Sequence, residues 1–529
     1  MTYILAYDIG STSLKTCLFR IDETIEMIGN TSADYGLYTL PNGGAEQHME
    51  EWWDAMCRST KRLMEHAPIG PEQIDGISFC SQMQGLVLVD EKGEPVRHPM
   101  SYMDQRGKEE MKRGIASGFK IAGMNAYRLL TSLRITGAVS GSVKDPLWKY
   151  LWVKNHEPQA FDKARWWLDV KEALIARMTG DCVMTEDSAY ATLLYDTRPG
   201  SRGWSGRLTR MFGVEPCHLP NVIRTTDVAG YLRQEQAQQL GLAAGTPVFG
   251  GGGDASLIGV GAGSVHTGDT HIYCGTSGWV STVVDQQTVD TGAMIASIIG
   301  AQEGSFNYFA EMETAGKCLD WVREHLALDE IGIYLSKKPV TEDPDLVYDS
   351  LQEYLSDVIE QSEPGAGGVV FTPWLHGNRC PFEDPNAAGV FFGLTLDTGK
   401  TEMIRAVTEG ICYHLCWMLE CQDKKIETSR TIRFCGGVAN SPVIAQILAD
   451  ITGRNIEVVE SPQNAGALGA ALTAAVGLGA IPDIGSTAGV IRVRSAFAPR
   501  TEHAESYRRN YEVFKKLHKQ NRKLFEQLG

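Results

Sequence analysis

Near its start the chain carries the stretch YILAYDIGSTSLKTCLF (Tyr3–Phe19), which we interpret as a strand, a polar turn and a return strand. The first strand ends at Asp8, whose carboxylate can hold a divalent cation through water. Gly10 lets backbone amides approach an anion, and side-chain donors follow it. The donors that we expect to bind phosphate are Ser11, Thr12, Ser13 and Lys15. An ordinary hairpin with a polar turn is the alternative that this stretch leaves open.

The same pattern recurs far along the chain, in THIYCGTSGWVSTVVD (Thr270–Asp285). Here Gly275 and Thr276 stand in the turn between an apolar strand and a β-branched return strand. Two such units indicate a duplicated architecture in which each half supplies one phosphate-facing hairpin. Two hairpins that face one cleft are what an actin-type nucleotide clamp requires.

Around the hairpins, strand-like and helix-like segments alternate, which predicts α/β domains with helices covering mixed sheets. In the second half, TIRFCGG is typical of a strand and SPVIAQILADITG of a helix. The turn CGGVANS joins them, and we expect Gly436, Gly437 and Asn440 to lie against adenosine. A plain tight turn between a strand and a helix could have the same sequence. We place the N-terminal domain at 1–261 and the C-terminal domain at 262–529.

Bulk composition narrows the class of protein. The 529 residues are too many for one core, which predicts two or more domains. A formal net charge of -16 argues against nucleic acid or an anionic membrane as the main partner. The sequence contains no run of about 20 apolar residues, so no membrane span is predicted. The 12 cysteines read as reduced core thiols of a cytoplasmic protein. The basic stretch from Tyr507 is expected to dock as a terminal amphipathic helix.

The segment GGGGDASLIGVGAG (Gly250–Gly263) places four glycines before one carboxylate, Asp254, and a small-residue helix. Glycine-rich turns before helices commonly hold phosphate, which a negative side chain would repel. A helix N-terminus favours a charged carboxylate, so we expect Asp254 to be ionised. It is either a structural cap or a general base.

With these segments in order, the chain resembles the FGGY carbohydrate kinases, and is most similar to their xylulose kinase branch. The resemblance covers nearly the whole chain and rests on several segments together. They are DIGSTSLKTCLF, GISFCSQMQGLVLVDEKGEPVRHPMSYMDQR, GGGDASLIGVGAG, CGTSGWV, PFEDPNAAGVFFGL and FCGGVANSPVIAQILADITG. It implies an actin-like ATPase fold of class α/β, in which two ribonuclease-H-like domains enclose a cleft for ATP, Mg²⁺ and sugar.

The same resemblance implies roles for particular residues. Asp254 would be the catalytic base, and Asp8 would hold Mg²⁺ through water. The sugar side would be formed by Met83, Gln84, Asp104, Asp254 and Ala255. Gly316 and Asp320 match the nucleotide side, although Asp320 could equally be a solvated helix residue. Xylulose kinases usually carry His at Gln84 and Asn at Ala255, and both departures remove polar groups that would address sugar hydroxyls.

We therefore expect an ATP-dependent sugar kinase that phosphorylates a primary hydroxyl of a ketopentose, with D-xylulose as the first candidate. Another ketose, a polyol or glycerol is the nearer alternative, and an actin-like ATPase without a metabolite substrate is the remote one. The expected partner is a small sugar; nucleic acid and membrane are not expected, and a homodimer is left open. The polar loop 376–386, with Arg379, Glu383 and Asp384, receives no chemistry and is expected to be structural or to lie at a subunit interface.

Overall fold

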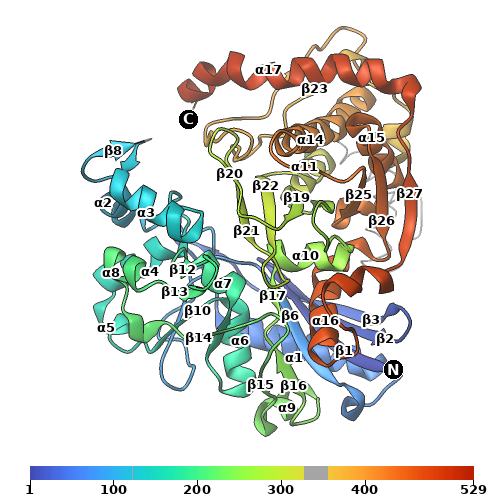
Figure 1. The fold of residues 1–529 in the computed structure, drawn as a ribbon. Helices are drawn as coiled ribbons and strands as arrows, with labels where there is room; N and C mark the ends of the chain where they lie inside the picture. The colour runs from blue at the N-terminus through green and yellow to red at the C-terminus, as the bar shows by residue number, and fades with distance from the viewer. Residues whose placement is uncertain (122, 327–355, 529) are drawn as a thin grey trace.

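The computed structural model describes residues 1–121, 123–326 and 356–528. They form two α/β domains, each built on one large mixed sheet (Figure 1). The first domain lies at the bottom and left of Figure 1, and the second lies at the upper right.

Seven strands make the first sheet, in the order β15-β16-β6-β1-β2-β3, with β17 paired to β6 beside β16. Its strands are β1 (Thr2–Ile9), β2 (Ser13–Ile21), β3 (Ile25–Asp34), β6 (Gly76–Ser81), β15 (Val228–Tyr231), β16 (Pro247–Phe249) and β17 (Gly252–Gly253). The hairpin β1–β2 is antiparallel and brings Asp8 opposite Lys15, whereas β1 and β6 run parallel. The strand, turn and return strand predicted from the sequence are therefore confirmed.

An eight-stranded sheet repeats this arrangement in the second domain, in the order β20-β21-β22-β19-β18-β25-β26-β27. Its strands are β18 (Thr270–Cys274), β19 (Gly278–Val284), β20 (Val289–Asp290), β21 (Ile295–Ile299), β22 (Phe306–Met312), β25 (Thr431–Cys435), β26 (Asn455–Val459) and β27 (Val493–Phe497). Again the leading hairpin, β18–β19, is antiparallel and its first strand pairs in parallel with a later one, β25. The predicted duplication is thus present in the topology.

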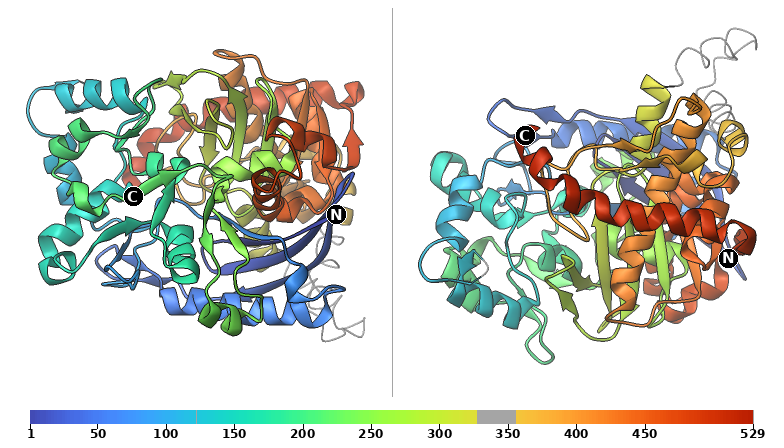
Figure 2. Two further views of the ribbon diagram at one scale, coloured as in Figure 1. Left: turned by 60° about the horizontal axis from the view of Figure 1, so that its bottom comes forward. Right: turned by 90° about the horizontal axis from the view of Figure 1, so that it is seen from above.

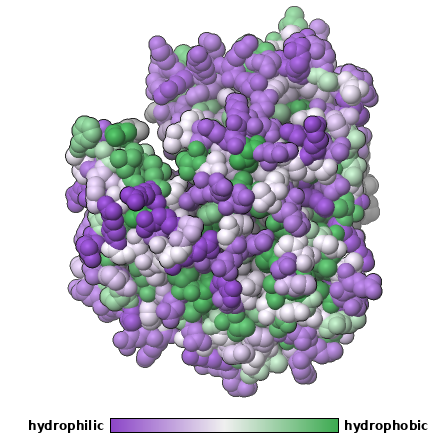
Figure 3. All heavy atoms as spheres, in the orientation of Figure 1, coloured by the Kyte–Doolittle hydropathy of each residue, from purple (hydrophilic) through white to green (hydrophobic). Residues whose placement is uncertain are grey.

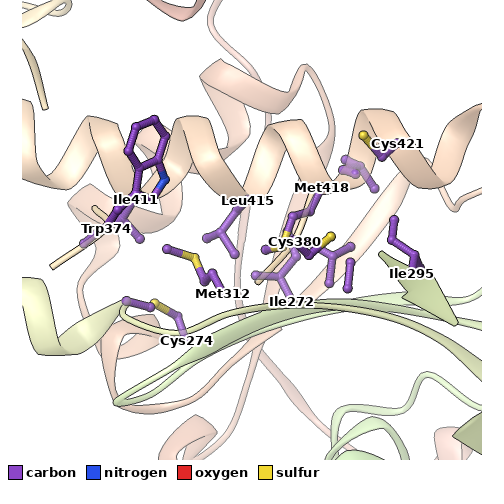
Figure 4. Close-up of a cluster of buried hydrophobic side chains, with 14 of the residues drawn as sticks. Ile272, Cys274, Ile295, Met312, Trp374, Cys380, Ile411, Leu415, Met418 and Cys421 are labelled. Atoms are coloured by element: carbon purple, nitrogen blue, oxygen red, sulfur yellow. The ribbon is translucent and has the colours of Figure 1, made fainter. Parts of the chain in front are cut away.

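Helices cover both sheets because their apolar faces have no other surface to bury. In the first domain they are α1 (Met49–His66), α6 (Val170–Thr179), α7 (Glu186–Ala191), α9 (Gln234–Leu240) and α10 (Asp254–Ala262). The second domain carries α11 (Gly316–His325), α14 (Lys400–Asp423), α15 (Pro442–Thr452), α16 (Ala465–Gly477) and α17 (Ala504–Leu528). Between α14 and the second sheet, side chains such as Ile272, Met312 and Leu415 form a continuous core (Figure 4).

A side lobe extends the first domain. It holds α2 (Lys108–Ile115), α3 (Ala126–Thr136), α4 (Pro146–His156), α5 (Pro158–Phe161) and α8 (Gly206–Phe212). Short strand pairs complete the chain: β4 (Tyr38–Thr39) with β5 (Ala45–Glu46), β7 (Val87–Val89) with β10 (Trp166–Leu168), β8 (Lys120–Ile121) with β9 (Met124–Asn125), β11 (Val183–Thr185) with β14 (Asn221–Ile223), β12 (Tyr195–Asp196) with β13 (Gly203–Trp204), and β23 (Val370–Phe371) with β24 (Phe391–Phe392). Figure 3 shows hydrophobic atoms at the surface of this lobe. Its exposed side chains include Phe119 and Tyr127.

The terminal helix α17 runs along the outside of the second domain (Figures 1 and 2). Its apolar side is buried as predicted, through Tyr507, Tyr511, Phe514 and Leu517. All 12 cysteines are free thiols and nine of them are buried, which confirms the prediction of core thiols for those nine. Among the described residues, no helix is long and apolar enough to cross a membrane.

One helix of the second half of the chain packs on the sheet of the first domain. Although α16 lies within the predicted C-terminal domain, it packs on β1, β2 and β6 of the first sheet and on α10 (Figure 1). The contact between α10 and α16 is at backbone distance: a Cβ on Gly261 would lie 1.9 Å from the carbonyl oxygen of Ala465, and one on Gly469 would lie 2.1 Å from that of Leu257. Glycine is required at both places because any side chain would push the helices apart.

We predict that Gly469→Ala destabilises the protein, although alanine favours an isolated helix. The added methyl group must displace α10, and overpacking of this kind costs about 1–3 kcal/mol. Thermal unfolding measures the effect. Gly206→Ala is the matched control, because a Cβ there meets nothing within 4 Å. A Gly469→Ala variant as stable as wild type would contradict the close contact.

Candidate functional site

The first hairpin presents its polar turn between the two domains. The amide of Gly10 donates to the Ser13 carbonyl at 2.9 Å, which closes the turn that holds Ser11 and Thr12. The Ser11 hydroxyl donates to the Tyr102 oxygen at 3.2 Å. Lys15 donates from Nζ to the carbonyl of Gln463 at 2.5 Å, so its side chain already contacts the second half of the chain.

Asp8 lies at the end of β1, opposite Lys15 on β2 and Cys80 on β6. Burial raises the pKa of this carboxyl above its ordinary value, and the positive charge of Lys15 opposes that rise. Within the described residues, no three His, Cys, Asp or Glu side chains are grouped so that they could hold a metal. A lone carboxylate fits Mg²⁺, which keeps several waters and binds mainly through one or two carboxylates and substrate phosphates.

A second turn faces the same region from the other sheet. The Gly275 amide donates to the carbonyl of Ser277 at 2.9 Å, and the carbonyl of Thr276 accepts from the amide of Ala315 at 3.0 Å. Gly316 begins α11 directly against this turn, since a Cβ there would lie 2.4 Å from the Gly275 oxygen. Asp320 is one turn further along α11, where its partly exposed carboxylate pairs with Arg323 at 3.3 Å.

The turn after β25 joins these two hairpins. Gly436 has φ of 94°, and a Cβ on it would lie 2.3 Å from the carbonyl oxygen of Cys274. A Cβ on Gly437 would meet open space, which leaves room for a ligand. Asn440 donates to the side chain of Gln463 at 3.1 Å. Because the carbonyl of Gln463 accepts from Lys15, residues predicted on the nucleotide side from both domains meet at this point.

Before Asp254, the four glycines are fixed by close neighbours. Gly251 has φ of 59°, and a Cβ there would lie 2.1 Å from the Phe79 oxygen. At Gly253 a Cβ would lie 2.1 Å from the sulfur of Met83, which therefore packs against the residue before Asp254. The glycines give the chain room to turn, as the sequence predicted.

A buried polar network holds this turn from below. The carboxylate of Asp187 accepts from the Gly253 amide at 2.7 Å and from the Thr185 hydroxyl at 2.5 Å. Thr185 also accepts from Lys171, whose ammonium group is fully buried and ion-paired with Glu172. Sequence reasoning missed these residues, since they are polar residues within segments whose pattern is that of ordinary helices.

Asp254 is the first residue of α10, with Gly253 as its N-cap, so it is not the structural cap. Its Oδ1 accepts from the amide of Ala255 at 2.8 Å. Burial raises the pKa of Asp254 to about 7, and the charges of Glu311 and Asp8 add to that rise. Our expectation that the helix terminus keeps this group ionised was therefore wrong near and below neutral pH, because desolvation outweighs the helix dipole.

The turn at Met83–Gln84, which is predicted to bind sugar, is held in an uncommon conformation. Gln84 has φ of 64°, a left-handed value that is rare outside glycine. Two buried charges hold the turn there: Lys149 donates to the Gln84 carbonyl at 2.7 Å, and Asp169 accepts from the Gly85 amide at 3.0 Å. Burial lowers the pKa of Lys149 to about 8. Ala255 presents its carbonyl to Asn307, which donates at 3.1 Å.

Asp104 has no exposed surface in this conformation. Its carboxylate accepts from both Nε and Nη2 of Arg106 and from the amide of Ala45, at 2.7 to 3.0 Å for Oδ2. Arg106 also pairs with Glu46 at 2.6 Å. The observed contacts of Asp104 thus brace the loop, and its direct contact with sugar stays a prediction.

The loop 376–386 reaches the site through Arg379. Arg379 Nη1 donates to Oε2 of Glu311 on β22 at 3.0 Å. Beside this pair, Lys144 of the first domain lies 3.6 Å from Glu313 of the second. Asp384 instead accepts from His518 of α17 at 2.8 Å. The sequence expectation assigned no chemistry to this loop, and Glu311 and Glu313 were not singled out at all.

The surface is hollowed beside the side lobe. Figure 3 shows a notch between the lobe that carries α2 and α3 and the domain that carries α17. Two further hollows of about 510 Å³ each lie elsewhere, one beside Asp423 and one beside Tyr127, and neither is lined by Asp254 or the hairpins.

Two sheets with matching phosphate-type hairpins and a carboxylate between them define an actin-like ATPase fold. Comparison of the sequence with known families narrows the class of protein further. Residues 3–261 match the N-terminal domain, and residues 271–478 the C-terminal domain, of the FGGY family of carbohydrate kinases. The chain belongs to this family.

Relatives of known activity include more than one kind of sugar kinase. A gluconokinase of Bacillus licheniformis is 29% identical over 525 residues, covering 97% of this chain and 95% of its own. A xylulose kinase of Bacillus subtilis (strain 168) is 27% identical over 522 residues, covering 98% and 97%. The crystal structure of a ligand-bound xylulose kinase from Lactobacillus acidophilus covers 100% of both chains with a TM-score of 0.84 and 24% identity, which supports the fold.

The raised pKa of Asp254 predicts a pH-dependent cost to stability. Between its ordinary value and about 7, the native carboxyl keeps a proton that the unfolded chain releases, so stability falls as pH rises through that window. Asp254→Asn should therefore unfold at a higher temperature than wild type at pH 8, and the difference should shrink toward pH 4.

Asp196→Asn is the control of opposite sign, because hydrogen bonds from Arg198 lower the pKa of Asp196. That variant should be less stable than wild type at pH 8. Melting curves of the three proteins across pH 4 to 8 make the comparison. An Asp254→Asn variant less stable than wild type at pH 8 would show that the site stabilises the charged carboxylate.

Proposed function

We propose that the protein transfers the γ-phosphoryl group of ATP to a terminal primary hydroxyl of an open-chain or furanose ketopentose, with D-xylulose as acceptor. The observation that carries the proposal is the position of Asp254 between the two hairpins and the Met83–Gln84 turn. Phosphoryl transfer depends mainly on positioning and charge stabilisation, and these elements supply both.

In this proposal, separate groups of residues bind the phosphates, the adenosine and the sugar hydroxyl. Hydroxyls and amides at Ser11–Ser13 and at Gly275–Ser277 bind phosphate oxygens, and Lys15 adds a positive charge. The turn at Gly436 and Gly437 receives the adenosine. Bound Mg²⁺, held by Asp8 through water, would neutralise charge on the phosphates. Asp254 accepts the proton of the sugar hydroxyl as that oxygen bonds to the γ-phosphorus; the bond to the β–γ bridging oxygen breaks, and ADP leaves with the electron pair.

The charges around Asp254 favour a neutral acceptor. The charges of Glu311 and Asp8 act on Asp254, and that of Glu313 acts on Glu311, whereas the cations Arg379 and Lys144 oppose the rise in the pKa of Glu311. A gluconate molecule would bring a further carboxylate close to the carboxyl groups of Asp254 and Glu311, and like charges in one site repel each other. Gluconate is nevertheless the second candidate, because gluconokinases match the chain as fully as xylulose kinases do.

Acceptor choice is tested with a panel of D-xylulose, other ketoses, alditols, glycerol and D-gluconate in an assay of ADP release. We expect the highest kcat/KM for D-xylulose, with glycerol and gluconate at least tenfold lower. A preference for gluconate would refute the acceptor while leaving the reaction type unchanged. ATP hydrolysis that no sugar stimulates would refute the kinase proposal altogether.

The role of Asp254 is tested with Asp254→Asn, which should lower kcat by about 10²–10⁴-fold, the usual contribution of a general base. Binding of ADP should survive, because the hairpins are unchanged. In the wild type, kcat/KM should fall as pH decreases below about 7, since the base must be ionised. Asp22→Asn, in an exposed turn, is the control. Near wild-type turnover of Asp254→Asn would remove Asp254 from the mechanism.

A further inference from the structure

Of the residues predicted on the acceptor side, Ala255 has only a methyl group and Met83 a thioether, and Asp104 is fully buried in its ion pair with Arg106. Gln84 has a side-chain amide, and its backbone carbonyl accepts from Lys149. An open-chain sugar carries several hydroxyls, and burying them without partners would cost much of the binding free energy. One amide cannot meet every hydroxyl of such a sugar, so further polar groups near Asp254 are needed.

The opposite wall offers such groups in the ion pair of Glu311 and Arg379. Their side chains are 30% and 42% exposed, although both lie between the domains. Within the described ranges, the guanidinium makes one hydrogen bond, to Glu311 Oε2, and its remaining N–H donors have no protein partner. Glu311 Oε1 likewise accepts no hydrogen bond from a described residue. The pair thus has hydrogen-bond donors on Arg379 and an acceptor on Glu311 that could bind a ligand.

Neighbouring contacts place this pair on the sugar side of Asp254. Asn307, four residues before Glu311 on β22 and on the same face, donates to the carbonyl of Ala255 at 3.1 Å. Glu311 acts electrostatically on both Asp254 and Tyr102, and Tyr102 belongs to the loop of Asp104.

A second set of contacts comes from α4 and the loop before it. Arg379 acts on Asp145, which is buried next to α4, and Lys149 of α4 donates to the carbonyl of Gln84. The pair is therefore on the side of the Met83–Gln84 turn. By contrast, two of the residues predicted to bind nucleotide, Lys15 and Asn440, contact Gln463.

We propose that Glu311 and Arg379 bind the acceptor sugar, as a subsite contributed by the C-terminal domain. Glu311 accepts a hydrogen bond from a sugar hydroxyl, and Arg379 donates to a sugar carbonyl or hydroxyl oxygen. This assignment rests on the proposed sugar kinase activity and adds residues that determine its specificity. It also makes the sugar contact both domains, so that acceptor binding favours the arrangement in which Asp254 and the hairpins are aligned.

The test begins with the acceptor panel, and the variants are then compared on whichever sugar the wild type prefers. Glu311→Gln and Arg379→Gln should each raise the KM for that sugar about ten- to hundredfold, as expected for a hydrogen bond to a charged group. The KM for ATP should change less than twofold. The double variant should be scarcely worse than the poorer single variant, because the two residues act as one unit.

Deoxy analogues sharpen the result. For the wild type, removal of the hydroxyl that meets Glu311 should lower kcat/KM by a factor similar to that of Glu311→Gln. In the Glu311→Gln variant the same analogue should carry little further penalty. A subsite that merely braces the domains would give no such coupling between one hydroxyl and one residue.

Glu50→Gln is the matched control, since it breaks a comparable ion pair, with Arg177 at 2.6 Å, on the first domain. Circular dichroism and ADP binding check that each variant is folded; Arg379→Lys replaces Arg379→Gln if the latter is not. A sugar KM within twofold of wild type, or an increase in the KM for ATP instead, would overturn the assignment. Failure of D-xylulose alone would refute only the proposed acceptor, whereas turnover of no sugar in the panel would contradict both proposals.

Discussion

The fold depends on the contact between α10 and α16. Each helix meets the backbone of the other, through Gly261 against the carbonyl of Ala465 and Gly469 against that of Leu257. Since α16 also covers β1, β2 and β6, this contact ties the end of the glycine-rich turn to the first sheet. Asp254 begins α10, so the position of the proposed base is set by a backbone packing distance that no flexible side chain can relax.

Around this fixed point the site is assembled from rigid parts. The hairpins end on paired strands of two sheets, and Gln463 connects Lys15 with Asn440 across them. Below the glycines, Asp187 holds the amide of Gly253 within a buried polar network that includes Thr185 and Lys171. Such support matters because catalytic positioning tolerates errors of only about half an ångström. The cost is that Asp254 loses solvation, which raises its pKa and links its charge to pH.

Local patterns predicted the hairpins, the glycine turn before Asp254 and the buried face of α17, because each depends on residues close together in the sequence. The return of α16 to the first sheet could not be predicted in this way, since small residues at helical spacing show only that a close partner exists. The raised pKa of Asp254 depends first on burial by the tertiary structure and then on the charges of Glu311 and Asp8, which lie far away in the chain. The pairing of Arg379 with Glu311 was likewise invisible, because each appears in the sequence as an ordinary polar residue of a loop or strand.

The path of α16 has a consequence for biosynthesis. The last strand of the first sheet, β17, ends at Gly253, but the helix that covers one face of this sheet is encoded about 200 residues later. At usual translation speeds of about 5–20 residues per second, α16 is synthesised roughly 10–40 s after the sheet that it covers. During this interval apolar side chains such as Ile4, Ala6 and Phe19 are exposed on the nascent chain. Chaperones that bind apolar segments therefore have a defined period in which to act on this protein.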